Sequence, residues 1–174
     1  TTGIVEPMSE KALIDTIAVD IRRHRAQGED ILVMAPGNYG LDYLKATCDI
    51  HSKQVIKISN FVGDSIDLAV CEGASGIVLA GHIGKLIKVA GGIMNTHSHQ
   101  ADARMEILTA YAAVAGADGE TLRLVMKAVT TDAGMEILQR CGLLSETMQL
   151  ILGKIQAHVQ KRAGSRVETG IIIF

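Results

Sequence analysis

The chain has 174 residues, a formal net charge of −2 at pH 7 and 48% hydrophobic residues, but only 3% aromatic residues and no Trp. This length favours one domain with a sizeable core, which aliphatic side chains must build. Basic and acidic residues are interspersed without a basic stripe, so nucleic acid is not an expected partner. Because no apolar run approaches the roughly 18 residues of a membrane span, a membrane is not expected either.

Two features of the sequence bear on where the protein works and how much of it is present. Cys48, Cys71 and Cys141 are far apart and include no C-x-x-C pair. This spacing predicts a reduced, cytoplasmic protein with buried thiols. The opening residues TTGIVEP begin without Met, from which we expect the chain to be the C-terminal part of a longer protein.

The first half of the chain repeats one pattern. Ser9 can cap a helix whose apolar stripe runs from Leu13 to Ile21, and Gly28 is placed to end it. Three units of strand, glycine-containing loop and helix follow. Their strands are apolar on both faces, which is typical of a parallel sheet. We expect strands at Ile31–Ala35, Gln54–Ser59 and Gly76–Ala80, and helices at Leu41–Thr47, Ser65–Gly73 and Lys85–Ala90.

The second half is mainly helical by the same criterion of apolar spacing. The expected elements are a helix capped by Ser98 and closed by Gly116, helices at Glu120–Val129 and Asp132–Cys141, a longer helix from Ser145, and a last strand within Val167–Phe174. Together the two halves predict an α/β fold: a three-layer, Rossmann-like parallel sheet with helices on both faces, in a single domain over residues 1–174.

In an open parallel sheet, ligands bind beyond the carboxyl ends of the strands. The loops expected to meet there are Pro36–Gly40, Ser59–Asp64 and Gly81–Lys85. In the first loop, Gly37 and Gly40 permit a tight turn and a close approach of the backbone to a ligand, and Tyr39 could stack on an adenine. A strand-to-helix turn without a ligand is the alternative interpretation.

The other two loops add polar and charged side chains. Asn60 and Asp64 follow the second strand, although Asp64 also suits the first turn of a helix. His82, Lys85 and Lys88 surround the third loop. They are either a cationic rim for an acidic ligand or, for the lysines, solvated groups on a short helix.

The segment Asn95–Glu106, NTHSHQADARME, is unusually polar. His97 and His99 have an H-x-H spacing that can ligate a metal, and Asp102 would share a helix face with His99. The spacing matches no zinc signature, however, and no cysteine is near. A metal site, an ordinary capped helix and a polar pocket with a catalytic role all stay open, and the density of polar residues after the Gly91–Gly92 turn favours the last.

Several motifs together resemble the cobalt-precorrin-5B methyltransferase (CbiD) family. They are TTGIVEPMSE, APGNYG, KISNFVGDSIDLA, GIVLAGHIGKLIKVAGGIMNTHSHQADARMEIL and AYAAVAGA. The similarity runs in order from Thr1 to about Ala117 and more loosely to Phe174, and members of the family carry an additional N-terminal region. The resemblance implies S-adenosyl-L-methionine-dependent methylation of ring carbon 1 of cobalt-precorrin-5B. The product would be cobalt-precorrin-6A of anaerobic cobalamin biosynthesis, with cobalt arriving on the corrinoid substrate and no metal of the protein's own.

Under that implication the candidate residues form three sets. The methyl donor would lie against Gly37, Asn38, Tyr39, Gly40, Asn60 and Asp64. Substrate carboxylates would meet His82, Lys85, Asn95, Thr96 and Arg104. His97 and His99 would donate hydrogen bonds or remove a proton, with Asp102 holding the ring of His99 in one tautomer.

Two other functions remain compatible with the residues. One is a different nucleotide-binding α/β enzyme that uses NAD or ATP. The other is a metal-dependent hydrolase that uses His97, His99 and Asp102. Strand order and homo-oligomerisation are left open by the sequence.

Overall fold

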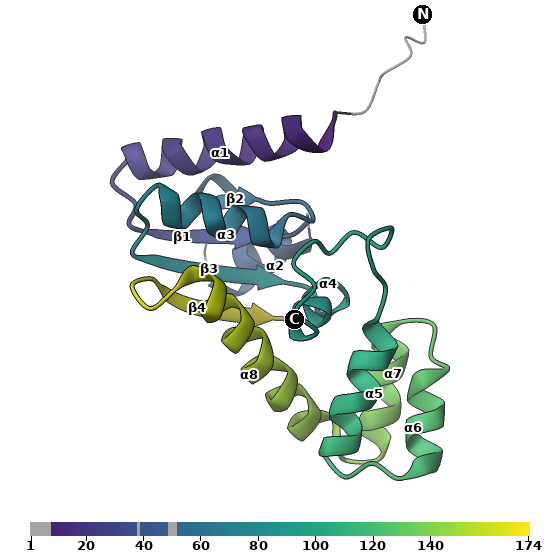
Figure 1. Cartoon of the computed structure of the whole chain (residues 1–174). Helices are drawn as coiled ribbons and strands as arrows, with labels where there is room; N and C mark the ends of the chain where they lie inside the picture. The colour runs from purple at the N-terminus through teal and green to yellow at the C-terminus, as the bar shows by residue number, and fades with distance from the viewer. Residues whose placement is uncertain (1–7, 38, 49–51) are drawn as a thin grey trace, which may run out of the picture.

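The computed structural model describes residues 8–37, 39–48 and 52–174, which form a four-stranded sheet with helices packed around it (Figure 1). All the strands run parallel, in the order β2-β1-β3-β4. They are β1 (Ile31–Ala35), β2 (Val55–Lys57), β3 (Gly76–Gly81) and β4 (Glu168–Ile173). The strand predicted at the end of the chain is confirmed, and it pairs with the whole of β3.

Four helices belong to the first half of the chain. They are α1 (Glu10–Ala26), α2 (Tyr39–Cys48), α3 (Val62–Cys71) and α4 (Ile83–Ala90), with a short 3-10 turn, η1 (Ser52–Gln54), before β2. Ser9 caps α1 as predicted, because its hydroxyl accepts from the N–H of Ala12 at 3.2 Å. The other three begin earlier than predicted. For α4 the reason is His82, whose Nδ1 accepts from the N–H of Gly84 and caps the helix.

The second half supplies α5 (Arg104–Val114), α6 (Gly119–Met126), α7 (Thr131–Arg140) and α8 (Leu144–Ala163). The helices α5, α6 and α7 pack on one another beyond one end of the sheet, and α8 runs back to β4 (Figure 1). The predicted start of α5 at Ser98 is wrong. Residues 98–100 form a turn and the helix begins at Arg104, because the backbone carbonyls of Thr96 and Ala101 are held by another side chain, described below.

Helices lie on both faces of the sheet, but unequally. One face, with Leu32, Met34, Ile77 and Leu79 among its fully buried residues, joins the main core together with α1, α3 and α8. On the other face, Leu44 of α2 packs with a small group of buried residues: Ala35, Val55 and Ala80. Ile31 on β1 stays 58% exposed. The protein is therefore an α/β structure with a parallel sheet whose second face is only partly covered by the described residues.

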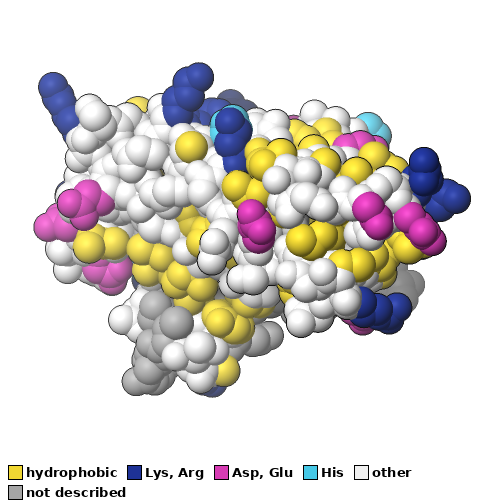
Figure 2. All heavy atoms as spheres, turned by 90° about the horizontal axis from the view of Figure 1, so that it is seen from below, with side chains coloured by type: hydrophobic (Ala, Val, Ile, Leu, Met, Phe, Trp, Pro, Cys, Tyr) yellow, Lys and Arg dark blue, Asp and Glu magenta, His cyan; other side chains and the backbone are white. Residues whose placement is uncertain are grey.

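The surface differs from the sequence-based expectation at two cysteines. Cys71 and Cys141 are exposed, so the prediction of buried thiols is wrong for both, and the side chain of Cys48 lies outside the described residues. Each of the two stands at the carboxyl end of a helix, α3 and α7 respectively. Hydrophobic side chains also reach the surface on the side seen in Figure 2. Among the helices that are described, none is long and apolar enough to span a membrane.

The helices α5, α6 and α7 form what we call the helical unit, and its stability should depend strongly on Leu108. This side chain is fully buried in α5, whereas Leu124 of α6 is 51% exposed. Replacing Leu108 with Ala should lower the free energy of unfolding by about 2–5 kcal/mol, because the change leaves a cavity. Leu124→Ala is the matched control and should change it by about 0.5 kcal/mol or less. Urea unfolding measures both, and equal losses would show that α5 is not packed as described.

Candidate functional site

Two pockets lie beyond the carboxyl ends of β1, β2 and β3. The first, which we call the α1 pocket, has a volume of about 370 Å³ and is lined by Leu13, Thr16, Ile17, Gly37, Lys57, Ser59 and Lys85. The second, the α7 pocket, has a volume of about 670 Å³ and is lined by Pro36, Gly37, His82, Gly84, Lys85, Arg104, Thr130, Thr131 and Asp132. Because Gly37 and Lys85 belong to both, these two residues form a shared wall.

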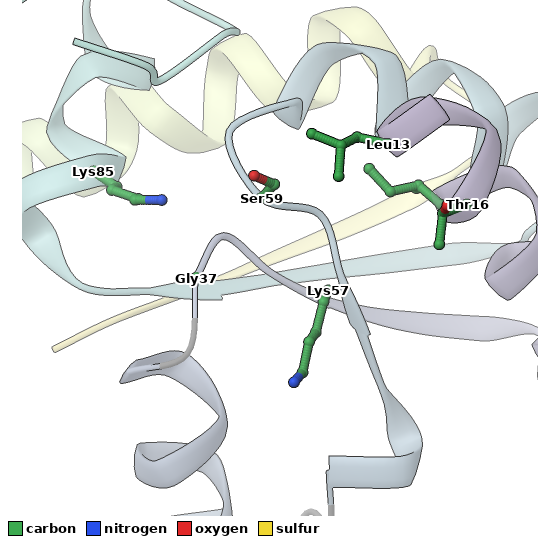
Figure 3. A pocket seen from close by; sticks show the side chains of 7 residues that line it. Leu13, Thr16, Gly37, Lys57, Ser59 and Lys85 are labelled. Atoms are coloured by element: carbon green, nitrogen blue, oxygen red, sulfur yellow. The ribbon is translucent and has the colours of Figure 1, made fainter. Parts of the chain in front are cut away.

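The loops around the α1 pocket have special backbone conformations. Gly37 has a φ of +97°, which an L side chain rarely adopts, and a Cβ placed on it would lie 3.5 Å from Nζ of Lys85. Ser59 has a φ of 51° and is the one non-glycine residue with positive φ in the described part of the chain. Such backbone strain is concentrated at ligand sites in proteins. Figure 3 shows the ammonium group of Lys85 pointing toward these two loops, with Leu13 and Thr16 of α1 beyond Ser59.

Asn60 connects the shared wall to the polar segment that follows α4. Its Oδ1 accepts from Nζ of Lys85 at 2.8 Å and from Oγ1 of Thr96 at 3.4 Å. Burial, and secondarily the charge of Lys88, lower the pKa of Lys85 below its ordinary value of 10.5. The structure therefore brings together three of the residues predicted for the site: Asn60, Lys85 and Thr96.

Backbone contacts place the segment 94–96 beside the loop that follows β2. Asn95 forms an isolated antiparallel bridge with Phe61, and the N–H of Thr96 donates to the carbonyl of Asn60 at 2.9 Å. The N–H of Gly63 donates to the carbonyl of Met94 at 3.0 Å. Phe61 itself is only 5% exposed and belongs to the core, so it is not a ring at a loop tip.

Lys88 has a role that neither sequence interpretation foresaw. It is neither a solvated lysine nor part of a cationic rim, because its residue is only 3% exposed. Its Nζ donates to the carbonyl of Thr96 at 3.2 Å and to that of Ala101 at 2.8 Å. Burial lowers the pKa of Lys88, an effect that the nearby Asp102 opposes and Arg104 reinforces. The ammonium group thus holds both ends of the segment 96–101.

The histidines of that segment are exposed on its turn. The N–H of His97 donates to Oδ1 of Asn95, and Nδ1 of His97 accepts from the N–H of His99, each at 3.1 Å. Neither ring is among the groups that line the two pockets. Within the described residues, no group of three His, Cys, Asp or Glu side chains is arranged to hold a metal.

Asp102 is paired with Arg104 through both of its carboxylate oxygens. The two N···O distances are 2.7 and 2.8 Å. This hydrogen bonding lowers the pKa of Asp102 below its ordinary value. The pairing was not anticipated, because Asp102 was expected to hold the ring of His99. Arg104 is also a wall of the α7 pocket, so the ion pair stands at the rim of that pocket.

His82 caps α4 and lines the α7 pocket. Its Nε2 lies 3.8 Å from Oδ1 of Asp132, and its ring meets that of Phe174 edge to face at a centroid distance of 5.9 Å. Asp64 is not at either pocket. It lies in the first turn of α3, and its charge contributes to raising the pKa of Arg162 on α8.

Some candidates are untested and some wall residues were missed. Asn38 lies outside the described residues, and Tyr39 and Gly40 are described only as backbone at the start of α2. The residues that sequence reasoning missed are Leu13, Thr16, Ile17 and Lys57 at the α1 pocket and Thr130, Thr131 and Asp132 at the α7 pocket. Nothing in their local sequence distinguishes them from ordinary helix and strand residues.

Comparison with known proteins shows what the chain is similar to. Residues 95–174 match the family described as "CbiD, C-terminal domain". The chain is 42% identical over its whole length to a cobalt-precorrin-5B C(1)-methyltransferase of Ruminiclostridium cellulolyticum, covering 45% of that protein. It is 41% identical, again over its whole length, to the protein of that name from Alkaliphilus metalliredigens, covering 46% of it. With the Salmonella typhimurium protein the identity is 42% over 96% of this chain and 42% of the relative.

These relatives all bear the name of one class of enzyme, the methyltransferases. The chain is similar to these proteins over its length, and its residues 95–174 are similar to the C-terminal domain of CbiD. It spans about half the length of the curated relatives it matches. No solved structure matches it.

The clamp formed by Lys88 is testable by hydrogen exchange. In a Lys88→Met variant the amides of residues 96–101 should exchange faster, because the carbonyls of Thr96 and Ala101 lose their shared donor. The free energy of unfolding should fall by about 1.5–3 kcal/mol, the usual range for hydrogen bonds to a charged group. Lys154→Met, on an exposed position of α8, is the control and should leave the exchange unchanged. Unaltered protection of residues 96–101 in Lys88→Met would argue against the clamp.

The side chain of Lys85 should lose its proton at a lower pH than an ordinary lysine, whose pKa is 10.5. Between the folded-state pKa and 10.5, the unfolded chain holds more protons than the folded chain. This group therefore favours folding increasingly as the pH rises through that window. An NMR titration of the Lys85 side chain measures the pKa directly, and a midpoint at or above 10.5 would contradict the burial described for it.

Proposed function

We propose that the protein to which this chain belongs transfers a methyl group from S-adenosyl-L-methionine to ring carbon 1 of cobalt-precorrin-5B. The product is cobalt-precorrin-6A, formed in anaerobic cobalamin biosynthesis. The observation that carries the proposal is the pair of pockets divided by Gly37 and Lys85. A methyl transfer needs two adjoining binding sites, so that the methyl group and the acceptor carbon can meet. The names of the relatives supply the substrate.

The α1 pocket is the proposed donor site, in a Rossmann-like arrangement. Its walls combine the apolar side chains of Leu13 and Ile17 with the loop backbones at Gly37 and Ser59. Apolar walls suit an adenosyl group, and a glycine with positive φ lets the backbone come close to a ligand. Asn60 contributes by fixing Lys85, to which it is hydrogen-bonded.

The α7 pocket is the proposed site for one edge of the corrinoid. Lys85, Arg104 and His82 line it, and cationic groups of this kind recognise the carboxylates that such a macrocycle carries. A whole macrocycle exceeds the pocket, so the remainder would extend over Asn95 and the neighbouring turn.

The proposed reaction requires the protein to orient the methyl donor and the ring carbon, and it requires no nucleophile from the protein. The bond between sulfur and methyl breaks as the ring carbon forms its new bond, and the donor leaves as S-adenosylhomocysteine. The protein's part is to hold the two reacting atoms in line and to exclude water. His97 and His99, on the turn beside the Asp102–Arg104 pair, would take up a proton as the methylated macrocycle rearranges.

Donor binding is tested by a pair of glycine substitutions. Gly37 and Gly28 both have positive φ, +97° and +84°, but only Gly37 lines a pocket, and a Cβ on Gly28 would meet nothing within 4 Å. Both variants to Ala carry a similar backbone strain of about 1–2 kcal/mol. We expect Gly37→Ala to weaken the calorimetric affinity for S-adenosylhomocysteine about tenfold or more, the equivalent of about 1.4 kcal/mol. Gly28→Ala should bind like the parent.

Equal affinity in the two variants would remove the α1 pocket from the donor site. Binding of NAD or ATP in place of S-adenosylhomocysteine would instead favour a different nucleotide-binding enzyme.

The proton-transfer role is tested by His97→Ala and His99→Ala in a full-length protein that contains this chain. Conversion of cobalt-precorrin-5B should fall about a hundredfold, the size of effect expected for a lost acid–base group. Affinity for S-adenosylhomocysteine should be unchanged, because neither ring lines the α1 pocket. Turnover at the parent rate in both variants would show that these histidines have no role in proton transfer and are only part of the turn.

A further inference from the structure

The N-terminus of α7 reaches the α7 pocket with unused hydrogen-bond donors. Oγ1 of Thr130 accepts from the N–H of Ala133 at 3.2 Å, and the carbonyl of Thr130 accepts from the N–H of Gly134 at 3.1 Å. The N–H groups of Thr131 and Asp132 have no acceptor among the residues described. Free N–H groups at the start of a helix attract anions, helped by the helix dipole.

The side chain of Thr131 gives a second indication that does not depend on the helix end. Thr131 is only 2% exposed, lines the pocket and makes no hydrogen bond with any described residue. Its Oγ1 lies 3.4 Å from where a Cβ on Gly84 would stand, and Gly84 lines the same pocket. Among the described residues, the buried side-chain atoms that lack a partner are Oγ1 of Thr109 and Oγ1 of Thr147. The unpartnered hydroxyl of Thr131 is therefore open to the pocket, where a ligand can supply a hydrogen-bond partner.

The charges around the pocket indicate which ligand this is. Lys85 and Arg104 line it together with Thr131. The pocket's one carboxylate among the described residues, that of Asp132, is 61% exposed and faces Nε2 of His82 at 3.8 Å. A carboxylate group placed at Thr131 would accept from neutral donors on α7, and Lys85 would balance its charge. Arg104 is already ion-paired with Asp102 and would contribute only its remaining N–H groups.

We propose that the α7 pocket is a carboxylate-binding site in which the hydroxyl of Thr131 and the first N–H groups of α7 receive the carboxylate, with Lys85 balancing its charge and Arg104 as a further hydrogen-bond donor. The source of the carboxylate rests on the proposed function, under which it is a side chain on the rim of the corrinoid. Under this proposal the helical unit has a binding role, because its helix α7 binds the substrate opposite the α1 pocket.

The chain offers a matched pair of variants for the test. Thr131→Val removes the hydroxyl with little change of shape. Thr147→Val is the control, because Oγ1 of Thr147 has no partner either but is buried in α8, and Thr147 lines neither the α1 pocket nor the α7 pocket. The probe is succinate, followed by the NMR shifts of the backbone amides of Thr131 and Asp132.

We expect succinate to shift these two amides in the parent and in Thr147→Val with the same affinity. Thr131→Val should bind at least about tenfold more weakly, the loss expected for one hydrogen bond to a charged acceptor. Uroporphyrin, a tetrapyrrole with carboxylates on its rim, should bind more tightly than succinate and show the same loss. Tighter binding of succinate than of uroporphyrin would assign the pocket to a small free carboxylate.

The site is overturned if succinate leaves the amides of Thr131 and Asp132 unmoved, or if Thr131→Val and Thr147→Val bind it equally well. Titration of S-adenosylhomocysteine into the same samples keeps the two proposals separate. A loss of donor binding with succinate binding intact contradicts the methyltransferase assignment and leaves the carboxylate site standing.

Discussion

The ammonium group of Lys88 is the interaction on which the arrangement of the site depends. It lies inside the protein and binds two backbone carbonyls, those of Thr96 and Ala101, which a single ammonium group can reach only if the chain between them bends back. The segment between them is therefore forced out as a turn, and α5 cannot begin until Arg104. Because that start sets where the guanidinium of Arg104 stands, one buried charge on α4 determines the rim of the α7 pocket.

A second consequence of this clamp is the contact between two loops distant in sequence. Because Lys88 fixes Thr96, the N–H and the hydroxyl of Thr96 can both donate to Asn60. Asn60 in turn accepts from the ammonium group of Lys85 and orients it. Lys85 and Gly37 then separate the two pockets. Burial, and secondarily the charge of Lys88, lower the pKa of Lys85 and so make its positive charge costly to keep. An anionic ligand next to Lys85 would therefore stabilise the protonated form of its side chain, whatever the ligand is.

Local sequence was a good guide where a single element decides its own structure. The apolar strands and the cap at Ser9 were predicted correctly, although β2 is shorter than predicted, because apolar runs and capping residues are local signals. The start of α5 was not, because Ser98 is a good cap by type and only the distant Lys88 overrules it. Thr131 illustrates the same limit for the candidate site. It is an ordinary helix residue in the sequence, and it becomes notable only when α7 is folded against Gly84.

The position of β4 has a consequence for how the chain folds. Its partner β3 lies in the interior of the finished sheet, yet one whole side of β3 is completed only by residues from the other end of the chain. Pairing between segments so distant forms late, since a long loop must first be closed. Until then the apolar strand GIVLAG presents an open edge, which other strands can join. A nascent chain of this protein therefore carries an aggregation-prone edge until the residues of β4 have been synthesised.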